Sequence, residues 1–228
     1  MRVHVAFTPA EAASSSIGIV VDVLRATSTI AQALATGYDR VYCCGEIDEA
    51  LALKERLGDA ILGGERNAVR VEGFDAGASP REFVGEPRAQ SVVFSTTNGT
   101  RAILETAARS DHVLLGSLLN LGAVAAAARE LDDDVTIVCA GFQGTFAIDD
   151  AYCAGRIVAL LGGEPTETAE RALELAASYA TTEEAFRTIR RVGETIAEED
   201  LVWCARESVT EVVPRFDGMR GSAARLVA

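Results

Sequence analysis

The chain alternates short, β-branched apolar runs with segments of helical periodicity, and this alternation limits the folds open to it. Apolar runs at 17–23, 91–95 and 135–140 each lead through a polar turn into a helical pattern. Strands that are covered on both faces read as continuous apolar runs of this kind. The alternation therefore predicts an α/β fold, in which a mainly parallel sheet carries helices on both faces.

The remaining elements are predicted from the same patterns. Further strands are expected at 40–44, 60–62, 112–115 and 209–213, the last one ended by Pro214. Helices are expected at 30–35, 48–57, 102–108, 121–131, 149–161, 167–179 and 183–191. The glycine-rich, polar segments at 63–66 and 73–80 are predicted to be irregular, and long loops in compact domains are often functional. No linker divides the chain, so a single domain spanning 1–228 is expected.

Charge and cysteine usage exclude several classes of protein. The formal net charge of −13 argues against nucleic acid and anionic membranes as partners. No apolar segment approaches the ~20 residues of a membrane span, and the N-terminus lacks a signal-peptide pattern. The cysteines are odd in number and show no C-x-x-C spacing, which predicts buried free thiols in a reducing, cytoplasmic compartment. They are Cys43, Cys44, Cys139, Cys153 and Cys204.

The segment Thr96-Thr97-Asn98-Gly99-Thr100-Arg101 carries the strongest chemical signal. It lies between a predicted strand and a predicted helix, where the first helical N–H groups lack internal partners and attract anions. Hydroxyls, an amide, a glycine and a guanidinium at such a turn predict a phosphate site. An ordinary helix cap with a turn glycine is the alternative explanation.

Acidic residues also follow predicted strands. Open parallel sheets bind ligands beyond the carboxyl ends of their strands. Asp22, Glu65 and the pair Asp149-Asp150 lie at such positions. Oxygen ligands in a chain with 2 histidines indicate Mg²⁺ rather than a multi-histidine zinc centre. Helix capping by these acids is the alternative, as are surface ion pairs for the neighbouring arginines.

Several common catalytic motifs are absent. The chain has no P-loop, no G-x-G-x-x-G fingerprint and no G-x-S-x-G elbow. Asp22-Val23-Leu24 is not a D-x-D motif, and Cys139 has no arginine at the spacing of a cysteine phosphatase loop. A covalent phosphoenzyme is therefore not indicated by any motif.

Five stretches together resemble the 2-phosphosulfolactate phosphatases (ComB-like proteins), and they occur in that family's order. They are 21–30, Gly63-Gly64-Glu65-Arg66, 73–83, 96–102 and 139–155. The resemblance implies a three-layer α/β/α fold and Mg²⁺-dependent hydrolysis of (R)-2-phospho-3-sulfolactate, a step that leads to coenzyme M in methanogens. Two positions depart from the family pattern: Ala78 stands where the family usually has Asn, and Asp149 where it tends to have Glu.

These observations lead to one hypothesis with assigned roles. Catalytic roles are expected for Asp22, Arg25, Glu65 and Arg101. Substrate or phosphate binding is expected for Thr27, Ser28, Arg66, Ser79, Thr97, Asn98, Gly99 and Thr100. Metal ligands are expected among Asp22, Glu65, Asp149 and Asp150, with water attacking the phosphate directly.

Two alternatives remain open at this point. One is a non-catalytic protein that binds an anionic metabolite at the same rim, and the other is a phosphatase for a different 2-phospho-hydroxyacid. The oligomeric state is also open, and a homodimer is the commonest arrangement for such domains.

Overall fold

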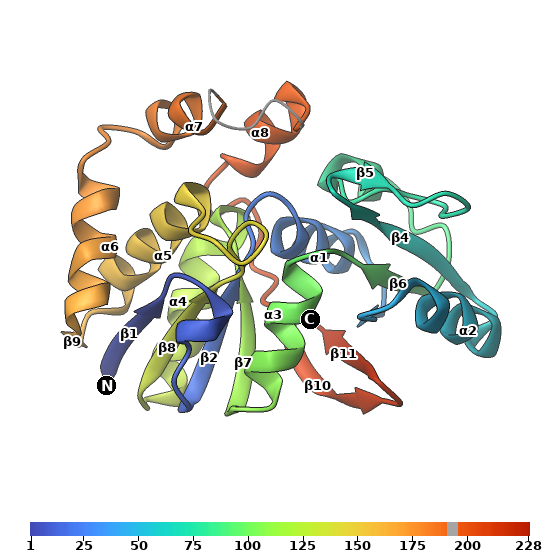
Figure 1. Cartoon of the computed structure of the whole chain (residues 1–228), viewed down its shortest axis with the longest axis horizontal. Coiled ribbons are helices and arrows are strands. Elements are labelled where there is room, and N and C mark those ends of the chain that lie inside the picture. Colours follow the sequence, from blue (N-terminus) through green and yellow to red (C-terminus); the bar gives the residue numbers. More distant parts are fainter. Residues whose placement is uncertain (191–195) are drawn as a thin grey trace.

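The computed structural model describes residues 1–190 and 196–228 and shows an 11-stranded mixed sheet with helices on both faces (Figure 1). The strands are β1 (Arg2–Ala6), β2 (Ser15–Val21), β3 (Arg40–Cys43), β4 (Ala60–Arg66), β5 (Val69–Arg70), β6 (Ser91–Ser95), β7 (Ser110–Gly116), β8 (Val135–Cys139), β9 (Glu164–Pro165), β10 (Arg215–Arg220) and β11 (Ala223–Val227). The helices are α1 (Ala26–Thr36), α2 (Ile47–Leu57), α3 (Gly99–Ala107), α4 (Leu121–Leu131), α5 (Ile148–Leu161), α6 (Glu167–Ala177), α7 (Thr182–Arg190) and α8 (Glu198–Cys204). Short 3-10 turns are η1 (Pro9–Glu11), η2 (Pro80–Phe83) and η3 (Leu118–Asn120). This architecture confirms the predicted three-layer α/β/α fold.

The sheet consists of two parallel blocks joined by a hairpin. Its order is β5-β4-β6-β3-β11-β10-β7-β2-β8-β1-β9. Strands β4, β6 and β3 are parallel to one another, and so are β7, β2, β8, β1 and β9. The hairpin β10–β11 pairs antiparallel with β7 on one side and with β3 on the other. The antiparallel hairpin makes the two blocks run in opposite senses, and the accumulated sheet twist rotates them further against each other.

Three apolar clusters fill the spaces between layers. The largest joins β1, β2 and β8 to α4, α5 and α6, and it includes Ile19, Ile137 and Ile157. A second packs α1 and α3 against β3, β6 and β7, and a third packs α2 against β3, β4 and β6. All five cysteines are buried and free, as the sequence predicts. In the part of the chain that the structure describes, no helix is long and apolar enough to span a membrane.

Two predicted elements are wrong. The glycine-rich segment 63–66 is not irregular, because it continues β4, which pairs with β6 as far as Gly64. A Cβ on Gly64 would lie 2.0 Å from the Ser95 carbonyl oxygen, so only glycine permits this close approach. The predicted strand at 209–213 is irregular, and Pro214 precedes the hairpin β10–β11 instead of ending the last strand. The last residue of the helix predicted at 183–191 lies outside the described residues.

Close packing between α5 and α6 depends on Gly155. A Cβ built at this position would lie 2.0 Å from the Ala172 carbonyl oxygen. We expect Gly155→Ala to lower the free energy of unfolding by about 2 kcal/mol, because overpacking outweighs the gain in helix propensity. Urea denaturation would measure this effect. Gly45→Ala is the control, since its Cβ would meet nothing closer than 3.9 Å; equal loss of stability in both variants would contradict the prediction.

Candidate active site

Asp22 lies in the turn between β2 and α1. Its side chain is only 7% exposed, and its Oδ1 accepts a hydrogen bond from the Ala26 N–H at 3.1 Å. The buried Thr27 hydroxyl accepts from the Asp22 N–H and donates to the Asp22 carbonyl. The Ser28 hydroxyl donates to the Val23 carbonyl at 2.8 Å. Thr27 and Ser28 therefore fasten the turn, and their hydroxyls point into it rather than toward a ligand.

Glu65, near the end of β4, connects two other turns. Its Oε1 accepts from the Thr97 N–H at 2.7 Å, and its Oε2 accepts from the Ala68 N–H at 2.7 Å. The Thr97 hydroxyl adds a bond of 3.3 Å to Oε2. The carboxylate thus joins the turn after β6 to the tight turn between β4 and β5.

The turn after β6 reaches from one block of the sheet to the other, because α3 packs on β2 and β7. Thr96 and Thr100 bond each other through their hydroxyls and backbone N–H groups, which fixes the first turn of α3. Asn98 Oδ1 accepts from the Gln143 N–H at 3.1 Å. A Cβ on Gly99 would lie 2.5 Å from Asp22 Oδ2, so this glycine lets the turn approach the carboxylate.

The third acidic position is the start of α5. Asp150 is 3% exposed, and its carboxylate accepts from the N–H groups of Val23 and Gly141 at 2.9 and 3.0 Å. It therefore ties the turns after β2 and β8 together. The Leu24 N–H lowers the pKa of the Asp149 carboxylate, which places Asp149 beside the turn that carries Asp22.

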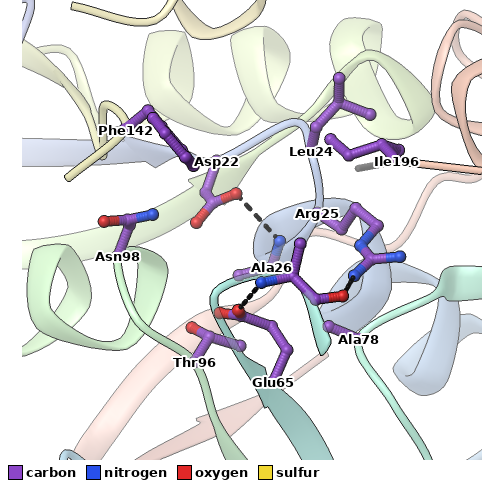
Figure 2. Close-up of a pocket in the computed structure, with 11 residues that line it drawn as sticks. Asp22, Leu24, Arg25, Ala26, Glu65, Ala78, Thr96, Asn98, Phe142 and Ile196 are labelled. Atoms are coloured by element: carbon purple, nitrogen blue, oxygen red, sulfur yellow. Dashed lines mark hydrogen bonds between the residues drawn. The ribbon is translucent and has the colours of Figure 1, made fainter. Parts of the chain in front are cut away.

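These turns enclose a small hollow of about 60 Å³ (Figure 2). Figure 2 shows the carboxylates of Asp22 and Glu65 pointing into the same space, with Asn98 at its side. The lining residues are Asp22, Leu24, Arg25, Ala26, Glu65, Ala68, Ala78, Thr96, Asn98, Phe142 and Ile196. The carboxyl ends of β2, β4, β6 and β8 therefore meet, although the two blocks run in opposite senses.

A larger hollow of about 270 Å³ adjoins the first and shares Asn98 with it. Thr97, Arg101 and Gln143 also line this second hollow. The Arg101 side chain is 75% exposed and pairs with Glu105 one helical turn away. Exposed ion pairs of this kind are weak, so Arg101 is available to an anion in the second hollow.

Negative charge is concentrated around the first hollow. Burial, opposed by the Ala26 N–H and the Arg25 cation and assisted by the carboxylates of Asp149 and Glu65, raises the pKa of Asp22 to about 7. Burial also raises the pKa of Asp149 to about 6, opposed by backbone N–H groups. The pKa of Asp150 is raised well above its ordinary value by burial and by Asp149 and Asp22. Asp22 thus has two carboxylate neighbours, Asp149 and Glu65.

A divalent cation fits this donor set only as a partly hydrated ion. In residues 1–190 and 196–228, no group of three or more His, Cys, Asp or Glu side chains is arranged to hold a metal by itself. Mg²⁺ does not need such a group, because it retains waters and is bound through one or two carboxylates together with substrate phosphate. The carboxylate oxygens at this rim suit that mode of binding. A bound cation would also offset the cost of burying the negative charges of Asp22 and Asp149.

The other sequence-predicted residues are distributed around the hollow. Arg25 lines it and pairs with Asp200. Arg66 lines neither hollow. Its guanidinium donates instead to the carbonyls of Glu65 and Gly45 and to the Ser95 hydroxyl. Ser79 caps η2 and donates to Asp200. Arg66 and Ser79 thus support neighbouring segments in this structure.

Sequence reasoning assigned no role to several residues of the site, among them Phe142, Ile196 and Asp200. Phe142 and Ile196 line the first hollow, and Asp200 holds Arg25. Phe142 follows the strand at 135–140 and could have been found from its place at a strand end. Ile196 and Asp200 lie far from the other site residues in the chain, and no local pattern marks them.

The fold and this rim are typical of an α/β enzyme, with helix N-termini and buried carboxylates around a small hollow at the carboxyl ends of strands. Residues 4–218 match the family model for 2-phosphosulpholactate phosphatase. The chain therefore belongs to the 2-phosphosulfolactate phosphatase family of phosphoric monoester hydrolases, which confirms the family and the enzyme class expected from the sequence.

Individual relatives agree with this assignment. A protein of Methanothermobacter thermautotrophicus named 2-phosphosulfolactate phosphatase is 39% identical over 95% of this chain and 92% of its own length. One from Thermus thermophilus, named probable 2-phosphosulfolactate phosphatase, is 38% identical over 98% of both chains. One from Clostridium acetobutylicum with the same name is 36% identical over 90% of this chain and 92% of its own length.

Proposed function

We propose that this chain hydrolyses (R)-2-phospho-3-sulfolactate to 3-sulfolactate and phosphate at the first hollow. The carrying observation is that Asp22 and Glu65 line one hollow beside the first turns of α1 and α3, with Asp149 close enough to raise the pKa of Asp22. Helix N-termini stabilise phosphate, and the carboxylates would provide oxygen ligands for a divalent cation. The family and the names of its relatives supply the substrate.

Mg²⁺ is the proposed cofactor, held by Asp22 together with Asp149 or Glu65. When bound, it would polarise the phosphoryl oxygens and lower the pKa of a coordinated water. Asp150 is given no ligand role in this proposal, because at 3% exposed it is more deeply buried than Asp22, Glu65 or Asp149. Its proposed role is to hold together the turn after β2 and the turn after β8.

The substrate's anionic groups are divided between the two hollows in this proposal. The phosphate lies in the first hollow, against Asn98 and the first turn of α3. Arg25 directs its remaining N–H donors at a phosphate oxygen. Arg101 and Thr97, in the second hollow, face the carboxylate or sulfonate. Thr27, Ser28 and Thr100 act indirectly by fixing the turns.

The decisive experiment is phosphate release by the purified protein. We expect turnover of 2-phosphosulfolactate in the presence of Mg²⁺ and its loss with EDTA, restored by excess Mg²⁺. A panel containing 2-phospholactate and 2-phosphoglycerate identifies the acid that is preferred. Tight binding of 2-phosphosulfolactate without turnover would instead establish a non-catalytic binding protein, and preference for another acid in the panel would replace the proposed substrate.

We further propose that the protein acts in the cytoplasm as a single catalytic domain and as a homodimer, with no nucleic-acid or membrane partner. The net charge of −13 disfavours polyanions and anionic lipid surfaces. Size-exclusion chromatography with light scattering distinguishes the dimer from a monomer of 24.0 kDa.

A further inference from the structure

Helix α8 brings a buried acid to the edge of the first hollow. Asp200 is 2% exposed, and each of its carboxylate oxygens has its own partner. Oδ2 accepts from Arg25 Nη1 at 2.7 Å, and Oδ1 accepts from the Ser79 hydroxyl at 2.5 Å. The two partners are 175 and 121 residues away in sequence. One side chain therefore connects three separate segments of the fold.

Those segments form neighbouring walls of the hollow. Arg25 itself lines it, and Ser79 follows Ala78, which also lines it. The Ala78 carbonyl accepts from the Thr29 hydroxyl of α1 at 2.6 Å, so this loop is fixed at a second point. Ile196, just before α8, completes the same side of the hollow. Asp200 lies behind these residues and does not itself line the hollow.

The geometry determines where the Arg25 guanidinium points. One N–H of Arg25 donates to Asp200, and Nη2 donates to the Ala68 carbonyl at 3.1 Å. Figure 2 marks the second bond with the dashed line at the labelled Arg25 guanidinium. A guanidinium has five N–H donors in a rigid plane, so two fixed bonds orient the remaining ones. Buried pairs of this type add little stability, and their value lies in fixed geometry.

We propose that Asp200 is a positioning residue, which orients Arg25 and the loop at Ser79 around the substrate's phosphate. The proposal rests on the proposed function, because it takes Arg25 as a phosphate ligand. Asp200 makes no contact with the substrate and acts only through its two partners.

Helix α8 has other attachments, so its position does not depend on Asp200 alone. Trp203 Nε1 donates to Gln32 Oε1 of α1 at 3.3 Å, and Leu201 and Cys204 are buried in the largest apolar cluster. Asp200→Asn keeps the side-chain shape and removes the charge. It is therefore expected to fold, which circular dichroism and the unfolding temperature would verify.

The test measures two quantities in four proteins: wild type, Asp200→Asn, Arg25→Gln and the double variant. The quantities are KM for 2-phosphosulfolactate and Kd for inorganic phosphate by calorimetry. We expect Asp200→Asn to raise both about tenfold or more, because a misdirected ligand loses its oriented bonds. In the Arg25→Gln background the same change should have a clearly smaller effect, because only the contact with Ser79 remains to be lost. Glu199→Gln, an exposed neighbour on α8, is the control and should leave both quantities unchanged.

In Asp200→Asn, the loss of charge and the loss of positioning predict opposite changes in phosphate affinity. Removing a negative charge near an anion site would by itself tighten phosphate binding, whereas loss of positioning weakens it. Tighter or unchanged binding by Asp200→Asn would overturn the proposal, and so would a loss that persists undiminished in the Arg25→Gln background. If the wild type binds phosphate but releases none from 2-phosphosulfolactate, the proposed function fails while the phosphate measurements still test Asp200. A wild type that binds neither ligand would refute both.

Discussion

Asp22→Asn is expected to lower the rate of phosphate release by about a thousandfold. The buried carboxylate is the central one of the rim, with Asp149 and Glu65 as charged neighbours. An amide keeps the hydrogen bond from the Ala26 N–H but is a poor ligand for a hard cation. Steady-state kinetics with saturating Mg²⁺ measure the loss.

The same substitution should leave the fold intact. Asp111→Asn, at an exposed position on β7, is the matched control and should retain wild-type turnover. An Asp22→Asn variant that keeps more than about a tenth of the wild-type rate would show that this carboxylate does not hold the reacting groups.

Stability of the metal-free protein is expected to fall as pH rises from about 4 to about 7. The pKa values of Asp149 and Asp22 are raised in the folded state to about 6 and about 7, from an ordinary value of 3.8. Folding therefore favours their protonated forms, and the resulting stability is complete below about pH 4 and is lost as both groups ionise. Mg²⁺ binds the ionised forms and offsets this loss by mass action.

Thermal unfolding with EDTA and with Mg²⁺, near pH 5 and near pH 8, measures this linkage. Mg²⁺ should raise the unfolding temperature near pH 8 by several degrees and have little effect near pH 5. Each kcal/mol of stabilisation corresponds to about 2–4 °C in a domain of this size. Asp22→Asn should reduce both the pH dependence and the Mg²⁺ effect. An equal Mg²⁺ effect at both pH values, or an unchanged response in the variant, would contradict the account.

Local patterns were sufficient for much of the fold because strand–helix alternation is a local signal. The predicted helix at 121–131 coincides with α4, and the apolar run at 91–95 coincides with β6. The hairpin β10–β11 could not be found this way, because its first strand, Arg215–Arg220, carries few apolar residues and half of it is exposed. Its place between β3 and β7 depends on pairing with strands far away in sequence.

The candidate site likewise contains residues that could be predicted from the sequence and residues that could not. Asp22, Glu65 and Asn98 could be predicted because each follows or ends a strand, and carboxyl ends of parallel strands are where ligands bind. Arg66 follows the same rule by position, yet its guanidinium turns to Gly45 and Ser95. Side-chain direction depends on tertiary partners that no spacing reveals. Asp200 is the opposite case, because it reaches the site from a short helix without a motif.

The most direct test of the central claim is a crystal structure of the active enzyme soaked with Mn²⁺, as a substitute for Mg²⁺, and with 3-sulfolactate. The account predicts an anomalous peak within about 2.3 Å of an Asp22 carboxylate oxygen, shared with Asp149 or Glu65, and the product between that ion and the first turn of α3. A metal bound away from Asp22, with the product in another cleft, would contradict it.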